Sequence, residues 1–240
     1  MSDAPSAPSL SATETFPFDA VLFDCDGTLV ESEPITFRVL SEMLNAVGWK
    51  ISATEFSEFF LGQSVKSRFD VIQSRTTIVD IEAWHASYRE KRDQALSQEV
   101  APTLFAGEVV QHLAQRHKVR LAVVSASSRA KIELQLGKVG MIRWFGCHIY
   151  SGQRSPRNKP WPDVYLQAAS SLGVDIRRCA IVEDSVSGVL AGVAAGGTVY
   201  AYMPPNRETG LRSSLLEAGA KDVFGDMRML PRILAETRML

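Results

Sequence analysis

The stretch FDCDGTLVES, at residues 23–32, closes an apolar run with two aspartates, Asp24 and Asp26, that are separated by a single residue. Gly27 follows them and allows the chain to turn sharply. Two carboxylates at this spacing repel each other unless a cation or a shared proton lies between them. A lone aspartate here would more simply cap a loop, but the pair at the end of an apolar strand indicates a divalent-metal site.

The segments on either side of this stretch alternate between strand and helix patterns. Five short runs rich in Val, Ile, Leu or Tyr predict buried strands, at residues 19–24, 118–125, 147–150, 179–184 and 198–203. Between the later runs, apolar residues at spacings of three and four predict helices, at residues 127–140, 162–173 and 185–196. This alternation predicts an α/β fold with a doubly wound parallel sheet, whose functional groups lie at the carboxyl ends of the strands.

The region from residue 34 to residue 100 breaks the alternation, because it reads as consecutive helices. Ser52 and Glu55 have the spacing of a capping box at the start of one of them. We therefore expect a small all-helical cap domain at residues 34–100, inserted over the carboxyl edge of the sheet. The α/β core would comprise residues 17–33 and 101–240, and residues 1–16, rich in Ser, Ala and Pro, would form a flexible tail.

Charge and cysteine usage narrow the class of protein. The 26 Lys and Arg residues nearly balance the 27 Asp and Glu residues, without any long block of like charge, so nucleic acid and membrane are not expected partners. The N-terminal segment lacks the basic start and apolar core of a secretory signal. Cys25, Cys147 and Cys179 are widely spaced in apolar runs, which predicts buried, reduced thiols and a cytoplasmic location.

Polar residues also mark the ends of three later predicted strands. Ser125 ends the second, where its hydroxyl and the N-terminus of the next helix could bind a phosphate oxygen, although such a serine more simply caps the helix. Lys159 follows the third strand and could neutralise a phosphate, although a lone loop lysine is usually solvated. Glu183 and Asp184 end the fourth, where adjacent acids are costly to bury without a cation.

Together these strand ends read, in chain order, as an acid pair, a hydroxyl, a lysine and a second acid pair. Acids without histidine or cysteine favour a hard, oxygen-binding metal such as Mg²⁺. A cluster of Mg²⁺, lysine and hydroxyl groups is typical of phosphoryl transfer. No GxxxxGK[ST] segment occurs, which excludes a P-loop enzyme.

At this point the sequence resembles the haloacid dehalogenase superfamily, and within it the subfamily I phosphatases that carry a helical cap, such as the beta-phosphoglucomutase and phosphoglycolate phosphatase group. The resemblance extends from Phe18 to Leu230 and rests on four motifs, which are DCDGTLV, VVSAS, NKPWPDVYLQAA and VEDSVSGVLAG. It implies a Rossmann-like core with a helical cap.

The resemblance also implies roles for the motif residues. Asp24 would be the nucleophile that forms an aspartyl phosphate, and Asp26 would protonate the leaving oxygen and later deprotonate the attacking water. The phosphoryl group would be held by Ser125, Ala126 and Lys159. The Mg²⁺ ligands would be Asp24, Asp26 through its backbone carbonyl, Glu183 and Asp184.

Departures from the family's other members favour hydrolysis of a phosphate ester. Dehalogenases and phosphonatases lack the second acid, which Asp26 supplies here. Beta-phosphoglucomutases carry a histidine ten residues after that acid, where this chain has Thr36. The expected function is therefore Mg²⁺-dependent hydrolysis of a small phosphorylated metabolite, with a sugar or sugar-acid phosphate favoured. A phosphosugar mutase and a non-catalytic binding protein with the same fold are the alternatives.

The predicted cap should set the substrate specificity. Its segment LGQSVKSRF, at residues 61–69, has the Gly-x₆-aromatic pattern of the substrate-facing loop in such caps. Lys66 is the expected substrate-binding residue there, with Arg68 as a second cation, although a basic residue at the start of an amphipathic helix is more often solvated. Trp84 and His85 lie in a predicted helix of the cap, where they could be packing and surface residues rather than substrate-binding residues. We expect a monomer or a weak homodimer.

Overall fold

The computed structural model describes residues 16–60, 64–117, 119–205 and 209–237. These residues form a six-stranded, all-parallel sheet with the strand order β3-β2-β1-β4-β5-β6. The strands are β1 (Ala20–Phe23), β2 (Arg120–Ser125), β3 (Ile149–Ser151), β4 (Cys179–Glu183), β5 (Thr198–Tyr202) and β6 (Asp222–Phe224). The predicted α/β fold class is confirmed.

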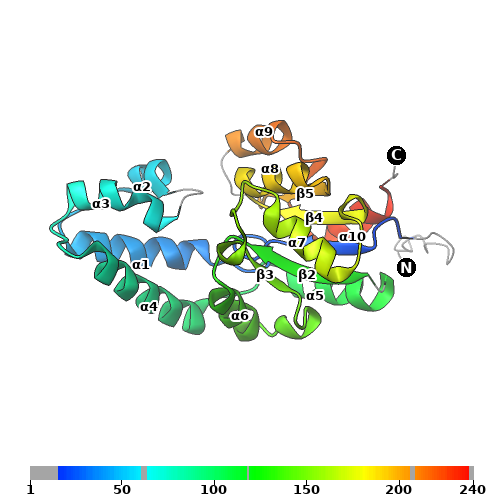
Figure 1. Ribbon diagram of the computed structural model, residues 1–240, viewed down its shortest axis with the longest axis horizontal. Helices are drawn as coiled ribbons and strands as arrows, with labels where there is room; N and C mark the ends of the chain where they lie inside the picture. The colour runs from blue at the N-terminus through cyan, green and yellow to red at the C-terminus, as the bar shows by residue number, and fades with distance from the viewer. Residues whose placement is uncertain (1–15, 61–63, 118, 206–208, 238–240) are drawn as a thin grey trace, which may run out of the picture.

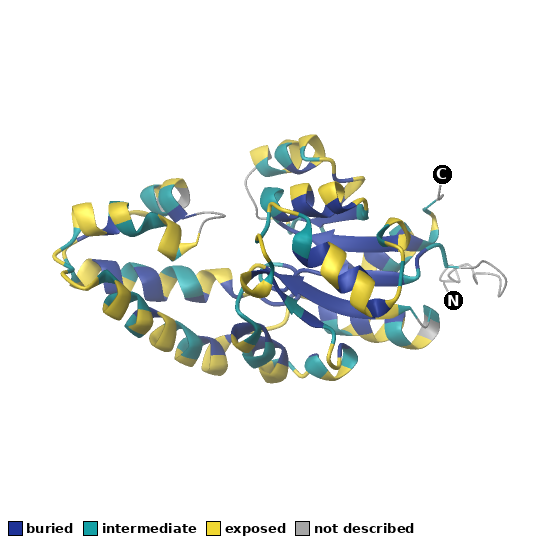
Figure 2. Ribbon diagram, viewed as in Figure 1, coloured by how far each residue is buried: buried dark blue, intermediate teal, exposed yellow. Residues whose placement is uncertain are grey.

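Helices cover both faces of the sheet (Figure 1). One face carries α5 (Ala106–His112), α6 (Arg129–Lys138) and α10 (Leu230–Ala235), and the other carries α7 (Asp163–Leu172), α8 (Val186–Ala195) and α9 (Thr209–Glu217). Side chains of β1 alternate between the two apolar cores, with Val21 and Phe23 in the first and Ala20 and Leu22 in the second. Because both faces are covered, every residue of β1 is buried and the strand is apolar throughout. Figure 2 shows the strands of the sheet mostly in the dark blue of buried residues.

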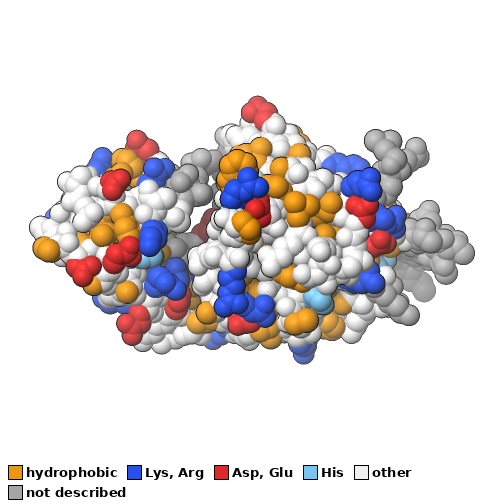
Figure 3. Space-filling model, in the orientation of Figure 1, with side chains coloured by type: hydrophobic (Ala, Val, Ile, Leu, Met, Phe, Trp, Pro, Cys, Tyr) orange, Lys and Arg blue, Asp and Glu red, His pale blue; other side chains and the backbone are white. Residues whose placement is uncertain are grey.

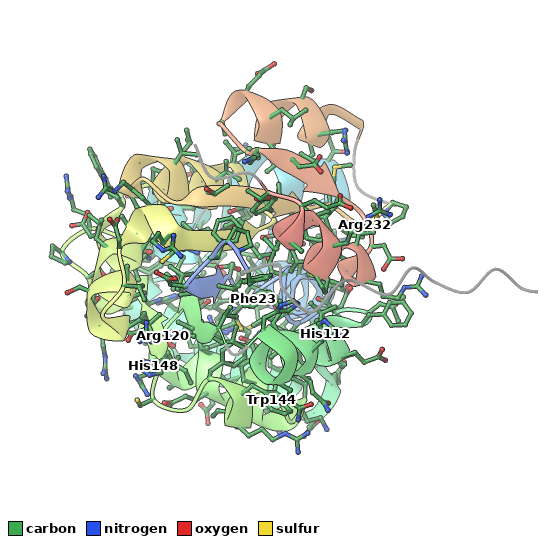
Figure 4. All side chains as sticks on the ribbon, turned by 90° about the vertical axis from the view of Figure 1, so that its right-hand side faces the viewer. Phe23, His112, Arg120, Trp144, His148 and Arg232 are labelled. Carbon is green, nitrogen blue, oxygen red and sulfur yellow. The ribbon has the colours of Figure 1, made fainter. Side chains whose placement is uncertain are left out.

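Figure 4 shows this layering along the sheet, from the end of the molecule away from the helices of residues 33–99. Phe23 lies at the centre of the view, and Trp144 lies on the side covered by the green helices. Phe23 packs edge-on against Phe145, with the ring centroids 6.3 Å apart. The strand that leads into the two aspartates is thus fixed by aromatic packing from the α5–α6 side.

Residues between β1 and α5 form a group of helices with its own apolar core (Figure 1). This helical group comprises α1 (Glu33–Ala46), α2 (Ala53–Phe60), η1 (Val65–Arg68), α3 (Phe69–Arg75) and α4 (Ile81–Glu99), and no strand lies among its described residues. The chain leaves and re-enters the sheet layer at neighbouring points, because the amide of Glu31 donates to the carbonyl of Ala101 at 3.0 Å. Val30 and Pro102 form an isolated antiparallel bridge beside it.

The five predicted strands are present, with ends that differ by one or two residues. Strand β6 and helices α5, α9 and α10 were not predicted, because each is short and its pattern spans too few residues to show a period. The predicted capping box is confirmed, since the amide of Glu55 donates to Ser52 Oγ at 3.2 Å and the amide of Ser52 donates to Glu55 Oε2 at 3.0 Å. Short helical turns complete the chain, at η2 (Leu113–His117), η3 (Ile142–Trp144), η4 (Gly152–Arg154), η5 (Ile176–Arg178) and η6 (Met227–Met229).

Two expectations at the level of single residues are corrected. Cys147 is exposed rather than buried, because it lies in the turn before β3, whereas Cys25 and Cys179 are buried as predicted. Most of the expected tail lies outside the described residues, but its last residue, Phe16, stacks on His117 with the ring centroids 4.3 Å apart. The first described residue of the chain is therefore packed against the core domain.

The described helices and surface also bear on the expected partners. None of these helices combines the length and the apolar character that a bilayer crossing requires. Basic and acidic side chains are interspersed over the face shown in Figure 3.

Candidate active site

The first predicted acid, Asp24, lies one residue beyond β1 at the carboxyl edge of the sheet. Its amide donates to the carbonyl of Val182 in β4 at 2.9 Å, which aligns it with the end of that strand. Gly27 then adopts a φ of 81°, in the left-handed region that favours glycine, and its amide bonds to the carbonyl of Val30 at 2.9 Å. This tight turn places Asp24 and Asp26 on the rim of the sheet and sends Cys25 into the core.

Lys159 joins the ends of three strands. Its Nζ donates to Asp24 Oδ1 at 2.7 Å, to Glu183 Oε1 at 2.6 Å and to the carbonyl of Val124 at 2.7 Å, so each of its three protons has an acceptor. The side chain is only 3 % exposed. Burial alone would lower the pKa of Lys159, but the two carboxylates outweigh it and hold that pKa well above its ordinary value.

Asp24 is held in a crowded, water-poor position. Burial raises the pKa of Asp24 to about 8, against the opposing effect of Lys159 and with a further contribution from the negative charges of Glu183 and Asp26. An ionised Asp24 would therefore need more positive charge nearby than Lys159 alone supplies.

Three acids form a compact oxygen cluster at this edge. Asp24, Glu183 and Asp184 are all buried, and one carboxylate oxygen of each lies within 4.8 Å of the others. Oxygen donors of this kind suit a hard divalent cation rather than zinc or copper. The cluster thus fits the metal set expected from the sequence. The side chain of Asp26 is not part of this cluster, and its backbone carbonyl as a metal ligand stays a prediction.

Glu183 is fixed by donors on both of its oxygens. The hydroxyl of Tyr165, which is fully buried, donates to Oε1 at 2.8 Å, and the Oγ of Ser185 donates to Oε2 at 3.0 Å. The start of α8 packs directly on this carboxylate, because a Cβ built on Gly188 would lie 1.9 Å from Glu183 Oε1. Only a glycine allows the helix to approach so closely.

Asp26 lies in a different environment from Asp24. Its Oδ1 accepts from Lys131 Nζ at 2.8 Å and Gln135 Nε2 at 2.9 Å, and also from Ser32, while its Oδ2 accepts from Ser127 Oγ at 2.7 Å. Burial alone would raise the pKa of Asp26. The ammonium of Lys131 and the hydrogen bonds outweigh burial and hold the pKa well below its ordinary value.

Ser125 is the last residue of β2, and Ala126 follows it at the carboxyl edge of the sheet. Ser125 Oγ accepts from the amide of Ser127 at 3.1 Å, and Asn158 Nδ2 donates to the carbonyl of Ala126 at 3.0 Å. The second bond ties this loop to the loop of Lys159. Ser128 caps α6, because its Oγ accepts from the amide of Lys131 at 3.3 Å.

The predicted cap residues lie in the helical group. Gly62 falls outside the described residues. Lys66 forms an exposed ion pair with Glu82 at 3.2 Å, and Arg68 donates to the carbonyl of Phe59 at 2.9 Å, so the structure brings neither of them into contact with the acid cluster. The role of Lys66 in substrate binding stays a prediction.

Trp84 and His85 have aromatic neighbours within the helical group. Trp84 stacks on Tyr88 with the ring centroids 6.1 Å apart, and His85 lies edge-on to Phe69 at 5.2 Å. Packing therefore accounts for both residues.

The sequence prediction missed the residues that surround the carboxylates of Asp26 and Glu183. A signal was present, because Ser127, Lys131 and Gln135 are spaced four residues apart and so share one side of the predicted helix. Nothing in the sequence showed that this side faces Asp26. Tyr165 lies within the quoted KPWPDVY motif, but its hydroxyl had no predicted role.

Comparison with known proteins gives consistent matches. The family model for haloacid dehalogenase-like hydrolases matches residues 18–196. The chain is 30 % identical over 186 residues to 6-phosphogluconate phosphatase of Escherichia coli K12, covering 77 % of this chain and 82 % of that protein. It is 28 % identical over 221 residues to hexitol phosphatase B of the same organism, covering 86 % and 96 %.

A solved structure is similar over nearly the whole chain. It is that of a hydrolase from Deinococcus radiodurans with bound phosphate and sodium, which is 33 % identical, with a TM-score of 0.75 and coverage of 92 % of this chain and 96 % of that one.

Proposed function

The chain belongs to the haloacid dehalogenase-like hydrolases, and we propose that it is a Mg²⁺-dependent phosphatase acting on a small phosphorylated metabolite. The observation that supports this most directly is the ammonium of Lys159, which bridges Asp24 and Glu183 at the carboxyl edge of the sheet. The bridge holds a carboxylate nucleophile beside positive charge, where an anionic phosphoryl group can approach it.

The acid cluster is suited to Mg²⁺. Asp24, the backbone carbonyl of Asp26, Glu183 and Asp184 would hold the ion through oxygen donors. When bound, Mg²⁺ would offset the repulsion between the carboxylates and the incoming phosphate.

Two aspartates would carry out the two chemical steps, which are formation of an aspartyl phosphate and its hydrolysis. Asp24 attacks phosphorus and forms an aspartyl phosphate, while Asp26 donates a proton to the leaving oxygen of the substrate. Asp26 then takes a proton from water, whose oxygen attacks the same phosphorus and releases inorganic phosphate and the free Asp24 carboxylate. Ser125 and the backbone of Ala126 would hold the phosphoryl oxygens during both steps, beside the positive charge of Lys159.

The favoured substrate class is a sugar or sugar-acid phosphate. Two relatives support it, because their names specify 6-phosphogluconate and hexitol phosphates as what they act on. We propose that the helical group, residues 34–100, is a cap domain that excludes water from the site, and that Lys66 meets the part of the substrate beyond its phosphate.

A phosphate-release screen tests the proposal. Purified protein with Mg²⁺ is incubated with 6-phosphogluconate, hexitol phosphates, hexose phosphates, phosphoglycolate and an aryl phosphate, and inorganic phosphate is measured with and without chelator. We expect chelator-sensitive release that is fastest with one sugar or sugar-acid phosphate. A mutase would instead convert a hexose 1-phosphate to the 6-phosphate. Release that is unchanged by the chelator, or no release from any substrate, would refute the proposal.

A further inference from the structure

The surroundings of Asp26 lead to an inference that rests on the proposed function. We propose that Lys131 is a positioning residue, whose direct contact with the carboxylate of Asp26 fixes the geometry of both proton transfers. Lys131 lies outside the motifs that identify the family, on the first turn of α6.

Lys131 is buried and directed at a single carboxylate. Its Nζ lies 2.8 Å from Asp26 Oδ1 and 3.2 Å from Ser127 Oγ, and the residue as a whole is 8 % exposed. A buried ammonium is costly unless it is paired, so this contact is needed by the lysine as much as by the aspartate. The pair is therefore a fixed part of the fold rather than an adjustable surface contact.

Two neutral side chains donate to the same carboxylate as Lys131. Gln135 lies one turn further along α6 and donates to the same oxygen of Asp26, and Ser127 lies just before the helix and donates to the other. The amide of Gln135 is itself oriented, because the thiol of Cys25 donates to Gln135 Oε1 at 3.8 Å. Lys131 differs from these neutral donors because it alone brings a charge that matches the carboxylate.

The two lysines of the site serve different aspartates. Lys159 has all three of its protons on Asp24, Glu183 and the carbonyl of Val124, so it has none left for Asp26. Lys131 therefore supplies the ammonium that keeps the carboxylate of Asp26 on the α6 side, apart from the acid cluster.

The exposed fraction of the side chain differs between Lys131, the positioning residue, and Asp26, the catalytic residue. The side chain of Asp26 is 22 % exposed, whereas that of Lys131 is 10 % exposed. A substrate can reach the carboxylate but meets little of the lysine. Because proton transfer depends steeply on donor–acceptor geometry, a loss of this support should slow catalysis without weakening substrate binding.

Substitution of Lys131 tests the inference on the substrate identified by the phosphate-release screen. Lys131→Met keeps the apolar stem and removes the charge, and we expect kcat to fall about 100-fold, as for a misplaced catalytic group. KM and the Mg²⁺ concentration for half-maximal activity should stay near wild type. Lys131→Arg should recover part of kcat. Lys138→Met removes an exposed lysine of the same helix and should leave the kinetics unchanged.

A double-mutant cycle gives the decisive readout. If Lys131 acts through Asp26, then Lys131→Met should cause no further loss of kcat in an Asp26→Asn background. Losses that multiply, or a Lys131→Met enzyme with wild-type kcat, would overturn the inference. If Lys131→Met does not fold, as judged by circular dichroism and thermal unfolding, the same cycle is run with Gln135→Met and Lys131→Arg, and multiplied losses there count equally against it.

The inference and the proposed function fail in different ways. A wild-type protein that releases no phosphate from any substrate refutes the function, and the inference falls with it. An active wild type with an equally active Lys131→Met variant refutes the inference alone.

Discussion

Two aspartates separated by one residue occupy opposite environments in this protein. Asp24 lies on the β4 side, where the ammonium of Lys159 donates to two buried carboxylates, those of Asp24 and Glu183, and the pKa of Asp24 is raised to about 8. Asp26 lies on the α6 side, where a lysine, an amide and two hydroxyls donate to one carboxylate, and its pKa is held well below the ordinary range. Two carboxylates that are two residues apart in the chain therefore differ in both their partners and their charge environment.

The difference also shows where positive charge is missing. The carboxylate of Asp26 has its own lysine, Lys131, whereas Asp24 and Glu183 share the single ammonium of Lys159. A divalent cation is therefore expected on the Asp24 side only. Changes to the two sides should therefore differ in their effects, and loss of the Asp24 carboxylate should have the largest.

Asp24→Asn should abolish turnover of every substrate, because an amide cannot form the aspartyl phosphate. The expected fall in kcat is about 10⁴-fold or more, measured as phosphate release by protein shown to be folded by circular dichroism. Residual turnover above about one per cent would remove Asp24 from the role of nucleophile.

Asp26→Asn sharpens the comparison because it should leave the first step possible for some substrates. An aryl phosphate has a leaving group that needs little protonation, so acid-quenched enzyme should still contain an aspartyl phosphate, detected as a mass increase of the protein. With an alkyl or sugar phosphate we expect a fall of about 10²- to 10⁴-fold. An equal loss of the intermediate with both kinds of substrate would show that Asp26 is not the proton donor.

Mg²⁺ should stabilise the protein more at pH 8 than at pH 5. Because folding raises the pKa of Asp24 from 3.8 to about 8, the stability contributed by this group is fully present below pH 3.8 and is lost as the pH rises through about 8. A cation that binds the ionised form offsets this loss, by about 2.7 kcal/mol at one hundred times its dissociation constant.

Thermal unfolding with Mg²⁺ or with chelator, at both pH values, measures this effect. A Mg²⁺ effect of equal size at pH 5 and pH 8 would contradict the assigned surroundings of Asp24.

Tyr165→Phe should have the smallest effect. The change removes one hydrogen bond to Glu183 Oε1 and leaves that of Lys159 in place. We expect the Mg²⁺ concentration for half-maximal activity to rise about tenfold, as is typical when a group that orients a metal ligand is lost. The value of kcat at saturating Mg²⁺ should change little. Tyr150→Phe, whose hydroxyl lies 3.2 Å from His148 Nδ1, is the matched control. Equal results for the two variants would show that Tyr165 does not support the metal site.

Much of the fold could be predicted because its pattern is local. Each buried parallel strand is an apolar run closed by a turn residue, and the helices between them show their own period. Strand β6 escaped prediction because its apolar run is only Val223 and Phe224, between Asp222 and Gly225. The exposed position of Cys147 escaped because it depends on a turn rather than on the apolar run beside it.

The part of the candidate site that lies at strand ends could also be predicted from the sequence. Parallel strands end at one edge of a sheet, so Asp24, Ser125 and Glu183 had to lie near one another once their strands were identified. Lys66 differs, because its position depends on how the helical group lies against the sheet, and the described structure pairs it with Glu82.

The sequence by itself determined the α/β fold class, the carboxyl edge as the place of the chemistry and the acid, hydroxyl and lysine groups that meet there. These features follow from residue type and spacing along the chain. Only the tertiary structure decided which donors meet each aspartate, since Lys131 is 105 residues from Asp26 and Lys159 is 135 residues from Asp24. Hydrogen bonding and charge pairing act over a few ångströms, so they depend on which faces pack together, and that information is not local in the sequence.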